Sequence, residues 1–136
     1  MSLRLTKKQR ATLREKFGGN CAYCGCELGE RWHADHLEPV LRGYAPVSES
    51  NPSGVLHVSR DVVENMMPAC GPCNLDKASY SLEQWRGKLS RSIESMQRYS
   101  STYRHALRFG LIAPTGAPVM FYFERGASHE NLKSAI

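Results

Sequence analysis

Residues 21–24 read Cys-Ala-Tyr-Cys, and residues 70–74 read Cys-Gly-Pro-Cys-Asn. A Cys-x-x-Cys turn brings two sulfur atoms to one ion, and two such turns complete the tetrahedral shell of a structural zinc. We therefore expect zinc to be held by the paired cysteines, which are Cys21, Cys24, Cys70 and Cys73. The alternative is a set of buried cysteines without a metal. Cys26 has poor spacing for a ligand, and we interpret it as a bystander thiol.

The two cysteine pairs lie far apart along the chain. Residues 25–69 separate them, which is more than the roughly 15–20 residues of a simple zinc ribbon. A zinc ion bound by both pairs would therefore join the two ends of a long intervening segment. That segment contains the dipeptide Asp35-His36.

The chain has 136 residues, a formal net charge of +5 and a sequence pI of about 9.1. That length is most simply one domain, and the basic balance favours nucleic acid as a partner, because Lys and Arg release counterions from phosphates. The alternative is a basic surface that only confers solubility. No stretch approaches the ~18 apolar residues of a membrane span, so we expect no membrane association and a cytoplasmic location with reduced cysteines.

The N-terminal segment predicts a helix over residues 6–17. Thr6 and Gln9 fit a capping box, and the glycines at positions 18 and 19 favour the end of the helix. Its basic side chains either form a solvated face or contact DNA phosphates. Those that we predict as DNA contacts are Lys7, Lys8, Arg10 and Arg14.

The middle of the chain predicts a small core over about residues 17–80. Glycines near the first cysteine pair favour a compact hairpin over residues 20–36. Residues 37–64 are rich in Pro, Gly, Ser and Asn and predict a long functional loop with one short strand at Val55–Val58. A second strand is predicted over residues 65–68. Residues 70–79 are predicted to begin as a knuckle and to continue as a helix.

The remaining residues predict a helix followed by a strand. Apolar residues recur at spacings of three and four from Leu82 to Leu107, which predicts one long helix over about residues 82–109. Its apolar stripe packs on the zinc core or, alternatively, forms a dimer interface, and its basic side chains would extend a DNA-binding surface. Residues 111–136 are expected to contain a short strand at Val119–Phe123 and a polar tail.

Four residues carry the groups that phosphodiester hydrolysis needs: Asp35, His36, Asn65 and Asn74. A histidine can deprotonate the attacking water, and a hard divalent ion prefers carboxylate and amide oxygens. Taken singly, each residue has an ordinary structural explanation, as a turn or surface pair, a loop cap or the start of a helix. Only their combination indicates a reactive site.

In combination, these residues resemble the HNH endonucleases. The resemblance rests on the two Cys-x-x-Cys pairs, the Asp-His dipeptide, Asn65, and the Asn74 and Lys77 that follow the second pair. It covers about residues 17–80. It implies an α+β fold with a treble-clef-like ββα-metal core, a four-cysteine structural zinc and a single nuclease domain over 1–136. The small size resembles phage-encoded members, which would act in the host cytoplasm.

The resemblance also implies a role for each matching residue. His36 is the general base, and Asp35 and Asn74 bind a catalytic Mg²⁺ or Mn²⁺. Asn65 braces the loop and orients the histidine, and Lys77 approaches the phosphate. The products are expected to carry 5′-phosphate and 3′-hydroxyl ends.

Two other functions stay open on the sequence. A zinc-stabilised DNA-binding module without catalysis fits the cysteines and the charge equally well, but it does not need the four polar residues of the reactive set. An accessory role in phage DNA packaging is suggested by the resemblance alone. Cutting of both strands would require a homodimer or two visits, because one such site handles one phosphate.

Overall fold

The computed structural model describes residues 3–41, 46–49, 54 and 56–125. The single domain stays a prediction, and within the chain the structure distinguishes two compact units: Met1–Leu82 with Phe121–Ile136, and Glu83–Met120. The first of these units contains the cysteines.

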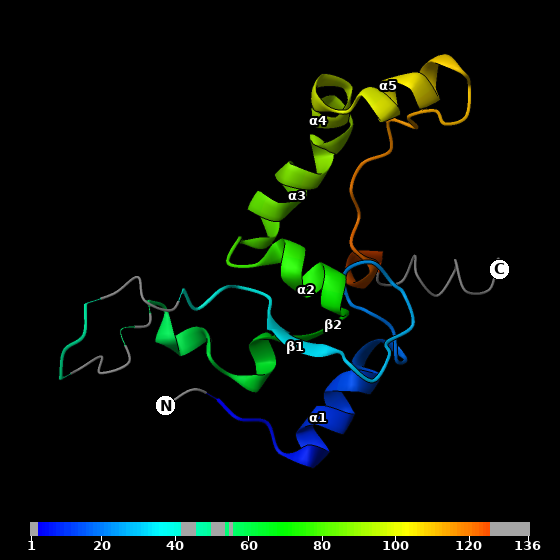
Figure 1. The fold of residues 1–136 in the computed structure, drawn as a ribbon. Helices are drawn as coiled ribbons and strands as arrows, with labels where there is room; N and C mark the ends of the chain where they lie inside the picture. The colour runs from blue at the N-terminus through cyan, green and yellow to red at the C-terminus, as the bar shows by residue number, and fades with distance from the viewer. Residues whose placement is uncertain (1–2, 42–45, 50–53, 55, 126–136) are drawn as a thin grey trace. The chain divides into compact units, whose positions relative to one another are not determined.

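A two-stranded antiparallel sheet lies at the centre of the first unit. Strand β1 is His33–His36 and strand β2 is Met66–Ala69, paired so that His33 faces Ala69 and His36 faces Met66. Helix α1, Lys7–Arg14, packs on β2, and helix α2, Gly71–Lys77, packs on β1. The two helices lie on opposite sides of the sheet (Figure 1). All four residues of β2 are buried, as expected of a strand that is covered on both faces.

The sequence at the N-terminus explains where α1 begins and ends. The Thr6 side chain accepts from the Gln9 amide and the Gln9 side chain accepts from the Thr6 amide, so the predicted capping box is confirmed. A 3₁₀ turn over Glu15–Phe17 ends at Gly18, whose φ of 67° lies in the left-handed region that glycine favours. The buried Leu13 fixes which face of the helix is turned inward.

The loop that contains the first cysteine pair packs against a C-terminal aromatic segment. Backbone amides of Tyr122 and Phe123 donate to the carbonyls of Tyr23 and Ala22 at 2.9 and 2.8 Å. The Tyr23 ring meets the ring of Phe121 edge-on at 5.8 Å. We predicted a strand over 119–123, but the segment is irregular and continues into a 3₁₀ turn at Tyr122–Arg125, so this prediction is wrong. Its aromatic side chains pack against the first cysteine loop, and this packing rather than strand pairing explains the aromatic content.

The hairpin predicted over residues 20–36 is also not formed. Strand β1 pairs with β2, which is distant in sequence, and only an isolated bridge joins Asn20 to Glu27. The second predicted strand is confirmed within one residue as β2. The strand predicted at Val55–Val58 lies partly outside the described residues, and Val58 begins a 3₁₀ turn that ends at Arg60. A further 3₁₀ turn, Val63–Asn65, leads into β2.

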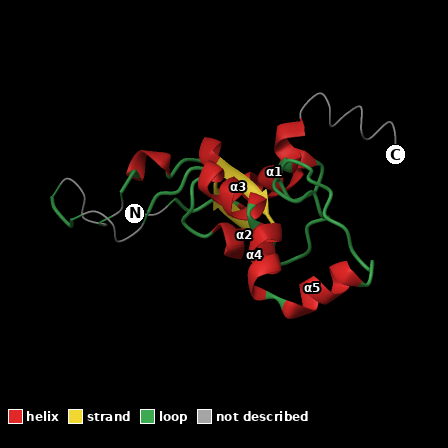
Figure 2. Cartoon of the chain, turned by 90° about the horizontal axis from the view of Figure 1, so that it is seen from above, coloured by secondary structure: helices red, strands yellow, loops and turns green. Residues whose placement is uncertain are grey.

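Three helices form most of the second unit. They are α3, Leu82–Ser90; α4, Ser92–Tyr99; and α5, Ser101–Arg108. The predicted uninterrupted helix over 82–109 is therefore wrong. The chain leaves the helical conformation at Ser100, where φ is −118° and ψ is 107°, and the Ser100 hydroxyl caps α5 by accepting from the Tyr103 amide. Figure 2 shows the helices and the loops between them.

Within this unit only part of the apolar stripe is buried. Trp85 and Tyr103 are buried, whereas Ile93 and Met96 are partly exposed and Tyr99 is strongly exposed. The three exposed members of the stripe all lie on α4, whereas Trp85 lies on α3 and Tyr103 lies on α5.

Candidate functional site

The four paired cysteines form one cluster. Their sulfur atoms all lie within 4.8 Å of one another, and the Sγ atoms of Cys24 and Cys70 are 3.8 Å apart. Zinc–sulfur bonds of ~2.3 Å at tetrahedral angles place two sulfurs about 3.8 Å apart. The cluster is therefore of the right size and chemistry to hold a structural metal ion such as zinc.

Local backbone geometry brings the two halves of this cluster together. The Cys21 amide donates to the Cys26 carbonyl at 2.7 Å and so closes the first turn. Gly25 permits this turn with a φ of 81°, and a Cβ there would lie 2.5 Å from the Tyr122 ring. The Cys70 amide donates to the sulfur of Cys21 at 3.4 Å, which joins the turn to the start of α2.

The sulfur atoms interact strongly even without a cation. A hydrogen bond with the Cys73 side chain lowers the pKa of Cys21 to about 4, and the same contact raises the pKa of Cys73. Cys26 is exposed, and partial desolvation, with further contributions from Cys24 and Cys70, raises its pKa to about 12. Thiolates crowded in this way repel one another, and a divalent ion would remove that repulsion. Cys26 lies outside the four-sulfur group but close to it.

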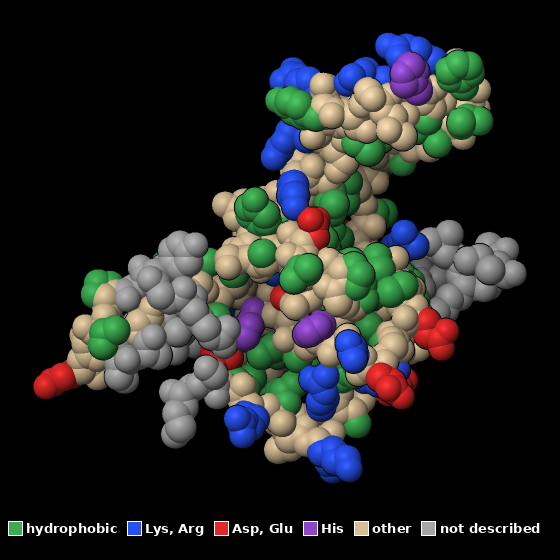
Figure 3. All heavy atoms as spheres, in the orientation of Figure 1, with side chains coloured by type: hydrophobic (Ala, Val, Ile, Leu, Met, Phe, Trp, Pro, Cys, Tyr) green, Lys and Arg blue, Asp and Glu red, His purple; other side chains and the backbone are tan. Residues whose placement is uncertain are grey.

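Beside the cysteines lies a polar pocket of about 550 Å³ whose lining includes Asp35, His36 and Asn74. The strand β1 contributes the first two residues, and the first turns of α2 contribute the third. The structure thus brings together three of the four residues predicted for a reactive site. Figure 3 shows purple histidine side chains at the surface in the region of β1.

Asp35 is held by two donors. The Tyr23 hydroxyl donates to its Oδ2 at 2.5 Å, and the Lys77 ammonium lies 3.2 Å from the same oxygen. Burial, followed by the charge of Asp35, raises the pKa of Tyr23 far above its usual value, so this hydroxyl stays protonated and donates. Among the described residues both contacts use Oδ2, and Oδ1 accepts no hydrogen bond from them.

Lys77 does not have the position that we predicted for it. Its side chain has an exposed fraction of 0%, and its Nζ donates to the His36 carbonyl at 2.8 Å in addition to pairing with Asp35. A buried ammonium with these two partners is not available to a phosphate. We therefore correct its role: Lys77 joins α2 to β1 beneath the pocket.

His36 has a partner that the sequence did not reveal. Its Nε2 lies 2.8 Å from Oδ1 of Asp61. An ionised carboxylate only accepts, so Nε2 is the donor in this contact. The other carboxylate oxygen of Asp61 accepts from the Leu3 amide at 2.7 Å, which helps to fix the side chain. Asp61 is 25 residues from His36 in a segment without periodicity, so no sequence pattern marked it.

Asn65 lies outside the pocket lining and braces the loop after β1. Its Oδ1 accepts from the Glu38 amide at 3.1 Å, and its Nδ2 donates to the carbonyls of Glu38 and Arg60 at 2.9 and 2.8 Å. Its own carbonyl accepts from Leu37 at 2.8 Å. These bonds tie the chain that follows His36 to the turn that precedes Asp61.

The predicted DNA-contacting residues of α1 divide into two groups. Lys7 and Lys8 are exposed. Arg10 donates to the Trp32 carbonyl at 2.9 Å and stacks on the Trp32 ring at 4.0 Å. Arg14 donates to two backbone carbonyls in the loop before β1, at 2.6 and 2.9 Å. The two arginines therefore have structural contacts within the first unit, and Arg10 is nevertheless exposed, as Lys7 and Lys8 are.

Comparisons of this chain with models of protein families, with curated proteins and with solved structures found no match. No helix within the described residues is long and apolar enough to cross a membrane.

Proposed function

We propose that this chain is a metal-dependent endonuclease of the HNH type that hydrolyses phosphodiester bonds in DNA. The observation that carries the proposal is the polar pocket in which His36 stands beside Asp35 and Asn74. A pocket lined by one histidine base and two oxygen donors contains the groups that hydrolysis of a phosphate ester requires. The net charge of +5 favours a polyanionic substrate.

In this proposal His36 is the general base. Its Nδ1 accepts a proton from the attacking water, while Asp61 holds the ring through Nε2 and stabilises the imidazolium that forms. Attack on phosphorus displaces the 3′ oxygen, which leaves 5′-phosphate and 3′-hydroxyl ends. Asp61 acts through His36 and is a positioning residue.

The oxygen donors fit a hard divalent ion. Oδ1 of Asp35 and the amide oxygen of Asn74 would hold Mg²⁺ or Mn²⁺, and such an ion neutralises charge on the phosphate and on the departing oxygen. Lys77 already compensates the charge of Asp35. We therefore expect the divalent ion to bind weakly, so that cleavage requires roughly millimolar ion.

The experiment compares His36→Ala with a matched control, His33→Ala, on the same strand. His33 is exposed and has no role in the proposal. Protein loaded with zinc is dialysed free of other ions, and cleavage of end-labelled DNA is followed with and without Mg²⁺ or Mn²⁺. Loss of a general base lowers the rate roughly 10²–10⁴-fold.

We expect the wild type and His33→Ala to cleave only with added ion, and His36→Ala to lose cleavage while it keeps its zinc and its circular dichroism spectrum. Cleavage by His36→Ala at the wild-type rate would overturn the assignment of the base. DNA binding without cleavage by the wild type in any tested ion would favour the second candidate, a non-catalytic zinc-stabilised DNA-binding module, which the basic charge also supports.

A further inference from the structure

The second unit accounts for most of the net positive charge of the protein. Residues 83–120 contain two acidic residues and six basic ones, giving a net charge of +4 against +5 for the whole chain. The six basic residues are Arg86, Lys88, Arg91, Arg98, Arg104 and Arg108. Such a concentration of like charge disfavours contact with a second copy of the same surface and favours a polyanion.

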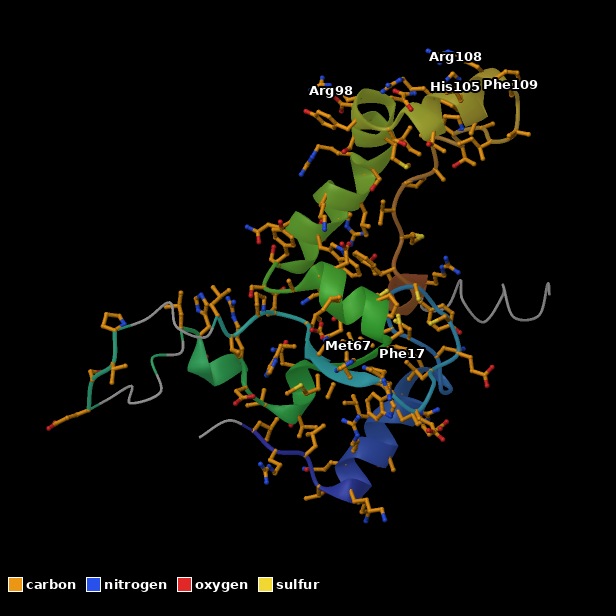
Figure 4. The ribbon with its side chains drawn as sticks, in the orientation of Figure 1. Phe17, Met67, Arg98, His105, Arg108 and Phe109 are labelled. Carbon is orange, nitrogen blue, oxygen red and sulfur yellow. The ribbon has the colours of Figure 1, made fainter. Side chains whose placement is uncertain are left out.

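Part of this charge forms a row along α4 and α5, in which Arg98 also pairs with Glu94 at 3.4 Å. Arg104 donates from Nη1 to the carbonyl of Arg98 at 3.1 Å, and Arg108 follows Arg104 one turn later on α5. Nη1 of Arg108 lies 3.5 Å from Nδ1 of His105. The His105 ring lies 6.5 Å from the ring of Phe109. Figure 4 shows the labelled members of the row along one edge of the two helices, and Figure 3 shows blue basic side chains along the same edge.

Exposed aromatic rings accompany the cations. Phe109 is 78% exposed and Tyr99 is 80% exposed. Neither contributes to the core of the unit, in which Trp85 and Tyr103 are buried. Exposed rings beside cationic side chains are the combination with which proteins bind single-stranded nucleic acid. The bases of a single strand suit such rings, because every unpaired base presents a flat face on which an aromatic ring can stack.

We propose that the α4–α5 edge, defined by Arg98, Arg104, His105, Arg108 and Phe109, binds nucleic acid with unpaired bases. The arginines contact phosphates, and Phe109 stacks on a base that a duplex would keep paired. Arg104 also donates to two carbonyls in the last turn of α4, those of Gln97 and Arg98. It therefore helps to fix the geometry of the edge in addition to its charge. The surface lies within residues 83–120 and does not depend on hydrolysis at His36.

The test measures binding without cleavage. Full-length, zinc-loaded protein carrying His36→Ala is titrated into a fluorescein-labelled 15-nucleotide single strand and into the duplex of the same sequence, with fluorescence anisotropy as the readout and no divalent ion added. Variants are added to this background: Phe109→Ala, Phe109→Leu, and Arg98→Ala combined with Arg108→Ala. Leu111→Ala is the matched control, because Leu111 is 77% exposed and apolar.

We expect the single strand to bind more tightly than the duplex. Phe109→Ala and Phe109→Leu should both weaken single-strand binding roughly 5- to 100-fold, because each removes the stacking face. The double arginine variant should weaken binding and reduce the slope of log K against log salt by about 1.4, since each lost phosphate contact contributes ~0.7. Leu111→Ala should bind as the background does.

Three results would overturn the proposal. The first is equal or tighter binding of the duplex. The second is unchanged binding by Phe109→Leu, which would show that the ring has no stacking role. The third is a dimer in sedimentation velocity that Phe109→Ala dissociates, which would assign the edge to a second copy of the chain. If the wild type cleaves DNA but the edge fails these tests, only the nuclease proposal is supported. If the wild type does not cleave DNA but the edge passes them, only the proposal of single-strand binding is supported.

Discussion

Replacement of Lys77 by methionine tests how the pocket is supported. Lys77 is fully buried. Its Nζ lies 2.8 Å from the His36 carbonyl and 3.2 Å from Oδ2 of Asp35. Methionine preserves most of the volume but leaves the buried carboxylate of Asp35 with the Tyr23 hydroxyl as its remaining donor. Removing one partner of a buried ion pair costs about 3–5 kcal/mol. For a unit of this size, that corresponds to a fall in Tm of roughly 10–20 °C.

The assay is urea unfolding followed by circular dichroism, with zinc in excess throughout. Asp35→Asn and the double variant Asp35→Asn with Lys77→Met complete a double-mutant cycle. The double variant should lose about 2 kcal/mol less unfolding free energy than the two single variants lose together, because it has no unpaired buried charge. If Lys77→Met unfolds like the wild type and only binds DNA more weakly, the ammonium reaches a phosphate and the buried ion pair is not its role.

Three further predictions concern the same unit. Chelation of zinc, or Cys70→Ser, should remove one bound zinc per chain and abolish the cooperative unfolding transition, with recovery after zinc is returned to the wild type; an unchanged transition without metal would refute a structural ion. Tyr23→Phe should cost about 1.5–3 kcal/mol at neutral pH through the lost bond to Asp35. Burial and the charge of Asp35 raise the pKa of Tyr23 in the folded protein above the usual value of about 10. Wild-type stability should therefore fall above pH 10 by up to about 1.4 kcal/mol per pH unit as the unfolded chain ionises, and Tyr23→Phe should lack this slope. Gly25→Ala should destabilise by about 2–4 kcal/mol, because the new Cβ meets the Tyr122 ring at a positive φ; an unchanged Tm would refute the close approach.

Features set by short-range rules could be predicted from the sequence. The capping box at Thr6, the end of that helix at Gly18 and the grouping of the four cysteines depend on neighbours in the chain or on the ligand number of one ion. The pairing of β1 with β2 is different, because it joins strands about 30 residues apart through a loop that carries no periodic signal. The hairpin prediction failed for that reason.

The helix over 82–109 shows a different limit. Its apolar spacing is regular through the break, so periodicity alone predicts continuity. The break depends on Ser100, whose hydroxyl offers the next helix a cap that competes with continuation. Asp61 and Lys77 show the same limit in the pocket: the partner of a histidine and the burial of a lysine are decided by tertiary packing, and a lysine followed by a turn reads as a surface residue.

The cysteine cluster and the polar pocket are connected along the chain as well as in space. Tyr23, which donates to Asp35, stands inside the first cysteine turn, between Cys21 and Cys24. On the other side, α2 begins at the second cysteine pair and carries Lys77 on its last turn. Both supports of Asp35 are therefore positioned by the segments that the cysteines hold. Loss of the structural metal should release Tyr23 and Lys77 together, so the pocket should lose its geometry even if every residue that lines it is intact.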